Sequence, residues 1–259
     1  MSETVLKTED LSKSYVLGKR KVQALSDLNL QVSAGEFVAI MGPSGSGKTT
    51  LLNVLGCLDK PTSGSVLLDG VNVAKLPESD LYKIRRNKIG FVFQTYNLMP
   101  YLNARENVEL PMEHSAKSKG ERKRRANELL GMVGLSGREA HRPRHLSAGE
   151  QQRVAIARAL ANDPAIILAD EPTGNLDSKT KHETIKLIAN LTINHGTTIV
   201  MVTHDRQMAA YAERVLFLND GRILKERQGL LLVKKKQMCP YCGRKVQLTD
   251  QDAPHAGKK

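Results

Sequence analysis

A glycine-rich loop between a buried strand and a helix constrains this chain more than any other feature. Residues 42–50 read GPSGSGKTT and fit the pattern G-x-x-x-x-G-K-[ST]. The apolar residues 37–41 before them indicate a strand, and residues 50–55 indicate the start of a helix. In that context the loop turns its backbone N–H groups toward phosphate oxygens, and the helix N-terminus adds a positive field. The spacing therefore predicts a nucleotide phosphate site rather than a chance glycine-rich turn.

Single residues of this loop have separate expected roles. Lys48 is placed to reach the β- and γ-phosphates, and the hydroxyl of Thr49 is placed to bind Mg²⁺. The other loop residues are expected to surround the phosphates, and they are Gly42, Ser44, Gly45, Ser46, Gly47 and Thr50.

Two adjacent carboxylates follow a second apolar run. Residues 165–169 indicate a buried strand, and Asp170 and Glu171 come directly after it. A carboxylate at the end of a parallel strand emerges at the edge of the sheet where ligands bind. We expect Asp170 to hold Mg²⁺, directly or through water. Glu171 is expected to polarise the water that attacks the γ-phosphorus.

The segment between these motifs makes the prediction more specific. Residues 146–160 read LSAGEQQRVAIARAL, in which a serine and small residues open a helix. This segment resembles the signature motif of ABC-type ATPases, in its L-S-G-G-Q/E form. The resemblance implies that Ser147 and Gly149 of one subunit bind the γ-phosphate held by the loop of the other. Two ATP molecules would then lie inside a head-to-tail dimer. The chain departs from the family once, because Ala148 stands where a second glycine is usual.

Four further residues match family elements in the expected order. The resemblance assigns Tyr15 to stacking on adenine, and Gln94 to Mg²⁺ and the attacking water. It places Asp177 in the loop that crosses the dimer interface, and His204 at the γ-phosphate. Catalytic roles thus fall on Glu171, His204, Gln94 and Lys48, with ATP and Mg²⁺ as cofactors.

The resemblance covers residues 3–225 and implies an α/β fold, that of a P-loop NTPase of the ABC ATPase type. It implies a mostly parallel core sheet, an antiparallel β subdomain and a helical subdomain at about 95–160. Alternating strand and helix patterns from residue 165 onward independently favour a parallel sheet. We expect an ATPase domain at 1–225 and a basic tail at 226–259. Within the family the chain is most similar to the lipoprotein-release, macrolide-efflux and cell-division group (LolD/MacB/FtsE-like).

The sequence contains no apolar run approaching the ~18 residues of a membrane-spanning helix. Its polar N-terminus lacks a signal-peptide pattern. We therefore expect a cytoplasmic ATPase subunit that forms a homodimer with ATP and drives a separate membrane permease from the inner face of the membrane. The alternative is a soluble ABC ATPase acting on nucleic acid or ribosomes. The insert of about 50 residues between Gln94 and the signature is too short for the coiled coil of repair ATPases, so no nucleic-acid partner is expected.

The tail carries much of the net charge of +12 and one motif of its own. From residue 225 onward there are nine Lys/Arg against three Asp/Glu. Cys239 and Cys242 lie in the sequence CPYCG, which has three interpretations: half of a zinc site, a redox pair as in glutaredoxins, or a turn without a ligand. A zinc site would need further ligands, from His255 or from the same pair in a second subunit. The third cysteine, Cys57, is expected to pack in the core.

Overall fold

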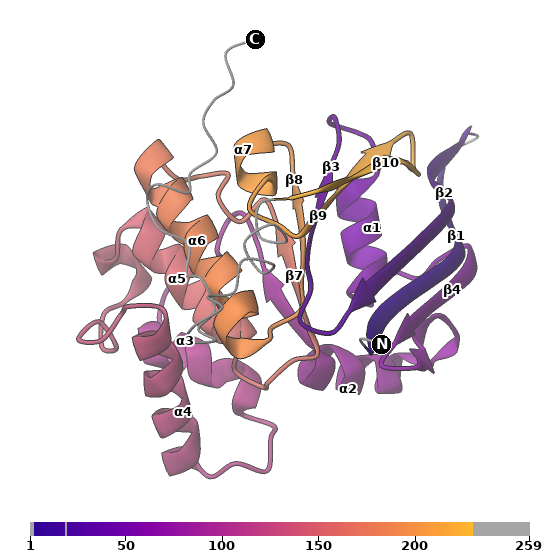
Figure 1. The fold of residues 1–259 in the computed structure, drawn as a ribbon. Helices are drawn as coiled ribbons and strands as arrows, with labels where there is room; N and C mark the ends of the chain where they lie inside the picture. Colours follow the sequence, from indigo (N-terminus) through magenta and orange to yellow (C-terminus); the bar gives the residue numbers. More distant parts are fainter. Residues whose placement is uncertain (1–2, 19, 230–259) are drawn as a thin grey trace, which may run out of the picture.

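Two sheets organise residues 3–18 and 20–229, which are the residues that the computed structural model describes (Figure 1). The first sheet is antiparallel and has the strand order β2-β1-β4-β5. Its strands are β1 (Thr4–Leu17), β2 (Arg20–Ser33), β4 (Ser63–Leu68) and β5 (Val71–Asn72). It is the antiparallel β subdomain that the sequence predicted.

The second sheet has the strand order β10-β9-β3-β8-β7-β6 within the described residues. Neighbouring strands from β9 to β6 run parallel, and β10 returns antiparallel beside β9. Every residue of β3 and β8 is buried, as expected for central strands of a parallel sheet that is covered on both faces. The strands are β3 (Phe37–Met41), β6 (Ile89–Val92), β7 (Ile166–Asp170), β8 (Ile199–Thr203), β9 (Arg214–Asn219) and β10 (Arg222–Gln228).

The helices fall into three groups. Helix α1 (Lys48–Leu55) follows the glycine-rich loop, and α2 (Glu78–Lys88) precedes β6. Helices α3 (Ala104–Glu109), α4 (Lys119–Met132) and α5 (Ala148–Ala159) contact one another and form the helical part between β6 and β7. Helix α6 (Ser178–His195) packs beside α5, and α7 (Arg206–Ala209) follows β8. Single turns of 3₁₀ helix occur at Val73–Lys75, Leu110–Met112 and Pro143–His145.

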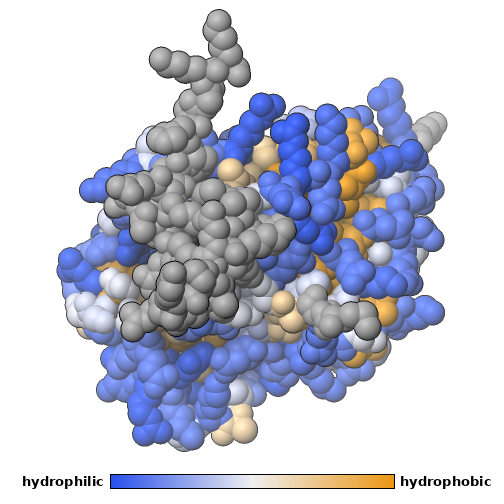
Figure 2. All heavy atoms as spheres, viewed as in Figure 1, coloured by the Kyte–Doolittle hydropathy of each residue, from blue (hydrophilic) through white to orange (hydrophobic). Residues whose placement is uncertain are grey.

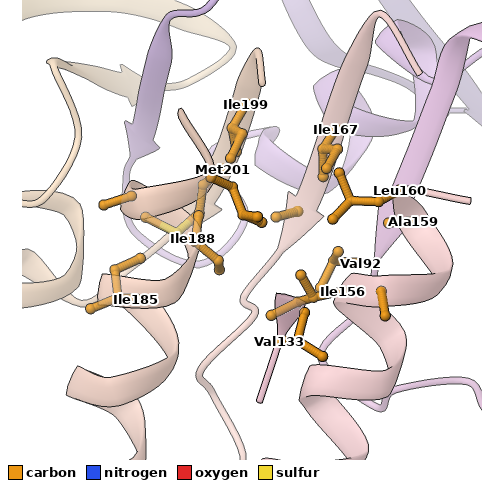
Figure 3. Packing of buried hydrophobic residues seen from close by; sticks show 14 of the residues in the cluster. Val92, Val133, Ile156, Ala159, Leu160, Ile167, Ile185, Ile188, Ile199 and Met201 are labelled. Carbon is orange, nitrogen blue, oxygen red and sulfur yellow. The ribbon is translucent and has the colours of Figure 1, made fainter. Parts of the chain in front are cut away.

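Alternate residues of the central strands supply two separate hydrophobic clusters. Phe37, Ala39 and Met41 belong to the cluster shared with α3 to α6, and Val38 and Ile40 belong to the cluster shared with α1 and the antiparallel sheet. This division follows because successive side chains of a strand point to opposite faces. Figure 3 shows part of the first cluster, in which sheet residues meet residues from helices α5 and α6, among them Ile156, Leu160, Ile167, Ile188, Ile199 and Met201.

The face of the molecule drawn in Figure 2 is mostly hydrophilic, with apolar patches between charged side chains. No helix of the described residues is long and apolar enough to cross a membrane. The mostly parallel core sheet, the antiparallel subdomain and the helical part agree with the predicted fold class. The predicted domain limits stay predictions. Strand β10 extends past the predicted limit at residue 225 and ends at Gln228.

Candidate functional site

The glycine-rich loop joins β3 to α1 and has the backbone shape that the motif predicts. Gly45 and Gly47 have φ values of 80° and 101°, in the left-handed region that favours glycine. A Cβ on Gly47 would lie 2.5 Å from the carbonyl oxygen of Ala24, so no other residue fits there. The Lys48 ammonium donates hydrogen bonds of 2.8 Å to the carbonyls of Gly42 and Pro43, which folds its side chain back over the loop.

Three features of this loop fit a bound phosphate chain and its metal. Gly47 is the N-cap of α1 and has no side chain to pair with the free N–H groups of the first helical turn. The Ser46 hydroxyl is buried and has no hydrogen-bond partner among the described residues. Thr49 is exposed at the same helix end. Unpaired donors at a helix N-terminus favour an anion, and the carboxylate of Asp170 favours a cation beside it.

Asp170 lies at the end of β7, as predicted, and Glu171 is the next residue. Burial raises the pKa of Asp170, and the neighbouring charge of Glu171 raises it further, while Lys48 opposes the shift. Glu171 has a φ of 44°, a left-handed conformation that is uncommon for a residue with a side chain. Its N–H donates to the carbonyl of Val202 at 3.0 Å, which ties the strained residue to β8.

The carboxylate of Glu171 is held by groups at the end of β8. Oε1 accepts hydrogen bonds from the backbone N–H of His204 at 2.9 Å, and Nδ1 of His204 lies 2.7 Å from the same oxygen. Oε2 accepts a bond of 3.0 Å from the buried hydroxyl of Thr203. His204 itself is exposed. Glu171 and His204 are therefore in contact, and their catalytic roles stay predictions. Thr203 is a contact that the sequence did not single out.

These groups line one pocket of about 660 Å³. The predicted residues that meet there are Ser44, Gly45, Gly47, Lys48, Thr49, Thr50, Asp170, Glu171 and His204. Residues Val22, Gln23 and Ala24 of β2 also line it and were not predicted. The structure therefore brings together the glycine-rich loop, the carboxylate expected to hold Mg²⁺ and the expected catalytic carboxylate.

Tyr15 lies beside this pocket without lining it. It pairs with Val22 across strands β1 and β2, so the two residues are neighbours on the sheet. The Tyr15 hydroxyl donates to Asp59 at 2.8 Å, and the Lys13 ammonium lies 4.8 Å from the ring centroid. Burial and the bond to Asp59 raise the pKa of Tyr15. Its stacking on adenine stays a prediction.

Gln94 is exposed and does not line the pocket either. Its amide nitrogen donates to Oδ1 of Asn175 at 3.3 Å, and the Asn175 amide donates back to the Gln94 carbonyl at 3.0 Å. This reciprocal pair joins the segment after β6 to the loop before α6. The proposed contact of Gln94 with Mg²⁺ stays a prediction.

Ser147, Gly149 and Asp177 form a second group outside the pocket. Ser147 caps α5, since its hydroxyl accepts from the N–H of Glu150 at 3.2 Å. Asp177 caps α6 and accepts a 2.6 Å bond from the hydroxyl of Thr180, which contributes most to the lowered pKa of Asp177. A Cβ on Gly149 would lie 2.4 Å from Cγ2 of Thr180. Ala148 is exposed, so the departure from the family pattern disturbs no packing within this chain.

A protein-family model described as "ABC transporter" matches residues 25–174, more than half of the chain, and spans the loop, the signature and both carboxylates. The chain belongs to the ABC transporter family. It is an ABC ATPase and an ATP-binding subunit of the transporter type, for which ATP and Mg²⁺ are the general cofactors.

Relatives support the same assignment. The chain is 52% identical over 228 residues to the uncharacterized ABC transporter ATP-binding protein MJ0796 of Methanocaldococcus jannaschii, covering 86% of this chain and 97% of that one. It is 46% identical over 227 residues to the macrolide export ATP-binding/permease protein MacB of Burkholderia thailandensis. That match covers 88% of this chain and 35% of MacB. The predicted similarity to the LolD/MacB-like group is thereby confirmed.

A solved structure agrees with the fold. The structure described as a dimeric post-hydrolysis state of the ATP-binding cassette MJ0796, bound to ADP and Pi, has a TM-score of 0.79 and 50% identity. It covers 86% of this chain and 98% of that chain. ABC ATPases of this family dimerise and pair with membrane permeases in general.

The cysteine motif of the tail lies outside the described residues, as do Cys239, Cys242 and His255. Among residues 3–18 and 20–229, no group of three or more His, Cys, Asp or Glu side chains is arranged to hold a metal ion. Cys57 is buried as predicted, and burial raises the pKa of its thiol to about 11.

Proposed function

We propose that this ABC ATPase hydrolyses ATP with Glu171 as the group that orients and deprotonates the attacking water. The observation that carries the proposal is the fixed carboxylate of Glu171, which lines the same pocket as Lys48 and Asp170. Its two oxygens already accept bonds from Thr203 and His204, so the carboxylate is held in place before substrate arrives. A positioned base of this kind needs no rearrangement in the transition state.

The other residues of the pocket bind and neutralise the triphosphate. The N–H groups at the start of α1 and the freed ammonium of Lys48 would contact phosphate oxygens, with Lys48 exchanging its bonds to Gly42 and Pro43 for the substrate. Thr49 and Asp170 would hold Mg²⁺, which supplies Lewis-acid stabilisation of the phosphoryl oxygens when bound. His204 would donate to the γ-phosphate, because its ring lies exposed beside Glu171.

Substitution of Glu171 and Lys48 separates catalysis from binding. Glu171→Gln should retain ATP affinity while the hydrolysis rate falls by roughly 10²–10⁴-fold, the usual contribution of acid–base catalysis. Lys48→Ala should weaken ATP binding itself, because an ammonium that contacts phosphate is lost. Phosphate release and ATP affinity would be measured on each variant. Parent-like hydrolysis by Glu171→Gln would exclude the proposed role.

We further propose that two subunits enclose ATP head to tail and drive a separate permease of the export, lipoprotein-release or mechanotransmission type. Ser147 is exposed at the N-terminus of α5, outside its own chain's pocket, where it is accessible to a second subunit. The macrolide export ATP-binding/permease protein MacB is named for both an ATP-binding part and a permease, which supports a membrane partner for this chain. The ATPase would then lie on the cytoplasmic face of the membrane.

The permease can be sought among proteins encoded beside this chain. We expect a membrane protein with four helices and a large extracytoplasmic domain. It should co-purify with Glu171→Gln in the presence of ATP, and reconstitution should raise the ATPase rate of the parent protein. Association of the ATPase with ribosomes or nucleic acid instead would favour the alternative function.

The zinc interpretation of Cys239 and Cys242 is kept as a proposal from the sequence. The zinc content per chain distinguishes a site shared by two subunits from a site within one chain. Cys239→Ser is the control. About half a zinc per chain would support a site shared by two subunits, and about one would support an intrachain site, since zinc takes four ligands in structural sites. Metal-free protein, purified with reduced thiols and without chelator, would contradict zinc binding.

A further inference from the structure

A second and more apolar cavity, of about 760 Å³, lies behind the nucleotide pocket. Strands β9 and β10 form one wall with Val215, Phe217 and Leu224, and the end of α7 forms another with Ala209 and Ala210. Gly42 and Pro43 at the start of the phosphate loop also line it. Apart from Gly42, none of the residues predicted for ATP or Mg²⁺ lines this cavity. Leu224 belongs to the apolar lining and is 63% exposed.

The chain itself leaves the described structure at this cavity. Gly229, the last described residue, lines the cavity and donates its N–H to the carbonyl of Glu213 at 2.8 Å. A Cβ on Gly229 would lie 2.1 Å from the carbonyl oxygen of Ala212, so the backbone passes close to the segment between α7 and β9. The position of Gly229 is thereby fixed at the cavity wall.

The next four residues, 230–233, read Leu-Leu-Leu-Val. They are followed by three lysines, and no comparable apolar run occurs in the remaining residues up to 259. Four extended residues span about 13 Å at about 3.3 Å each, and they start from a residue that already lines the cavity. Burial of four large apolar side chains is favoured over their hydration.

We propose that residues 230–233 of the same chain occupy this cavity and fix the start of the basic tail to the ATPase domain. The apolar walls match the apolar run, while Arg206, Lys225 and Arg227 line the cavity with positive charge. That charge repels Lys234, Lys235 and Lys236, so occupancy ends at Val233 and the lysines stay in water. The docked segment lies against the wall that carries Gly42 and Pro43, whose carbonyls hold Lys48.

The chain has no tryptophan, which allows a sole fluorescent reporter to be placed in the full-length protein. Leu230→Trp, Leu231→Trp and Leu232→Trp are made separately, and Leu248→Trp is the control within the same tail. Indole emission shifts to shorter wavelength when the ring is shielded from water. We expect at least one of the three reporters to emit at shorter wavelength than the control and to resist quenching by acrylamide.

Charges placed in the cavity identify the occupied surface. Leu224→Asp and Ala210→Glu, each combined with the shielded reporter, should return its emission to that of the Leu248→Trp control. Leu224 is exposed and Ala210 is half-buried, so both variants should fold, and cooperative thermal unfolding checks this. Val71→Asp, at an exposed apolar residue of β5, is the matched control and should leave the reporter shielded.

Each other occupant gives a distinct result that overturns the proposal. Emission equal to the control in all three reporters means that the run is hydrated. Shielding that survives both cavity variants places the segment elsewhere. Shielding that grows with protein concentration means that a second copy provides the surface. Shielding that appears only with vesicles of anionic phospholipid means that the run and its lysines bind a membrane instead.

Discussion

The carboxylate of Glu171 depends on one hydroxyl that no sequence motif pointed to. Thr203 is fully buried and donates to Oε2 of Glu171 at 3.0 Å. We expect Thr203→Val to lower kcat by roughly 10–100-fold, because a hydrogen bond to a charged group contributes about 1.5–3 kcal/mol. The KM for ATP should change little. In a protein that already carries Glu171→Gln, Thr203→Val should lower kcat almost no further.

Thr198, which directly precedes the first residue of β8, provides the control. The buried hydroxyl of Thr198 accepts a 3.0 Å hydrogen bond from the N–H of Gly35, far along the strand from Glu171. Thr198→Val should lower the stability by a similar amount and leave kcat unchanged. Equal effects of the two substitutions on kcat would mean that Thr203 acts only through the fold.

The raised pKa of Asp170 predicts how stability varies with pH. Burial disfavours the ionised carboxylate in the nucleotide-free protein, so the folded pKa lies above the unfolded value of about 3.9. The neutral acid is compatible with the fold at low pH, and stability is lost as pH rises through the folded pKa. Asp170→Asn should therefore raise Tm at pH 7 and have no such effect below about pH 3.9. Added MgATP should stabilise the parent more than the variant.

The sequence predicted those site residues whose spacing defines a motif. Lys48, Thr49, Asp170 and Glu171 follow apolar runs at fixed offsets, and the parallel sheet brings the ends of those runs together. Residues that act through tertiary contacts were not predicted. Thr203 is one of three threonines in the described strands, with Thr4 and Thr8, and the pairing of β7 with β8 places it beside Glu171.

Among the secondary-structure elements, α5 and α6 meet closely where Gly149 faces the side chain of Thr180. The hydroxyl of Thr180 is bonded to Asp177, which prevents the side chain from rotating away, and its methyl group faces Gly149. Gly149→Ala should therefore destabilise the protein by about 1–3 kcal/mol, as overpacking does. Ala148→Gly, one residue earlier and exposed, should cost no more than about 1 kcal/mol. Chemical unfolding of both variants measures the difference.

Removal of the facing methyl group should rescue the first of these variants. Thr180→Ser keeps the hydroxyl that Asp177 accepts from and removes Cγ2, the atom 2.4 Å from the added Cβ. In the double variant Gly149→Ala/Thr180→Ser, most of the lost stability should return. An unchanged deficit would show that the strain lies elsewhere in α5.

The strands and helices were easier to predict than their mutual contacts. Buried strands such as β3 and β8 are continuous apolar runs, and helices α3, α4 and α5 begin with polar caps that the sequence displays. The pairing of Gln94 with Asn175 depends on where two separate loops end after the sheet has formed. No local pattern contains that information.

On the scale of the whole molecule, the two halves of the proposed ATP site lie in different places on one chain. The phosphate loop and Glu171 line one pocket, whereas Ser147 and Gly149 lie outside it. A complete site therefore requires a second subunit, if the signature binds phosphate as proposed. ATP that binds between subunits stabilises the dimer by mass action, so dimerisation should depend on its concentration.

Two of the three capping boxes in the described residues begin with serine, and they allow this dependence to be tested against a matched control. Ser147 caps α5 and Ser118 caps α4 in the same way, with acceptor distances of 3.2 Å and 3.3 Å from the following glutamate N–H groups. Ser147→Ala and Ser118→Ala should each cost about 0.5–2 kcal/mol of stability through loss of the cap. Only Ser147→Ala should also remove a contact with the partner's ATP.

In sedimentation of Glu171→Gln with saturating ATP, we expect the dimer to persist with Ser118→Ala and to be lost with Ser147→Ala. Equal dimerisation of the two variants would contradict the assigned role of Ser147 across the interface.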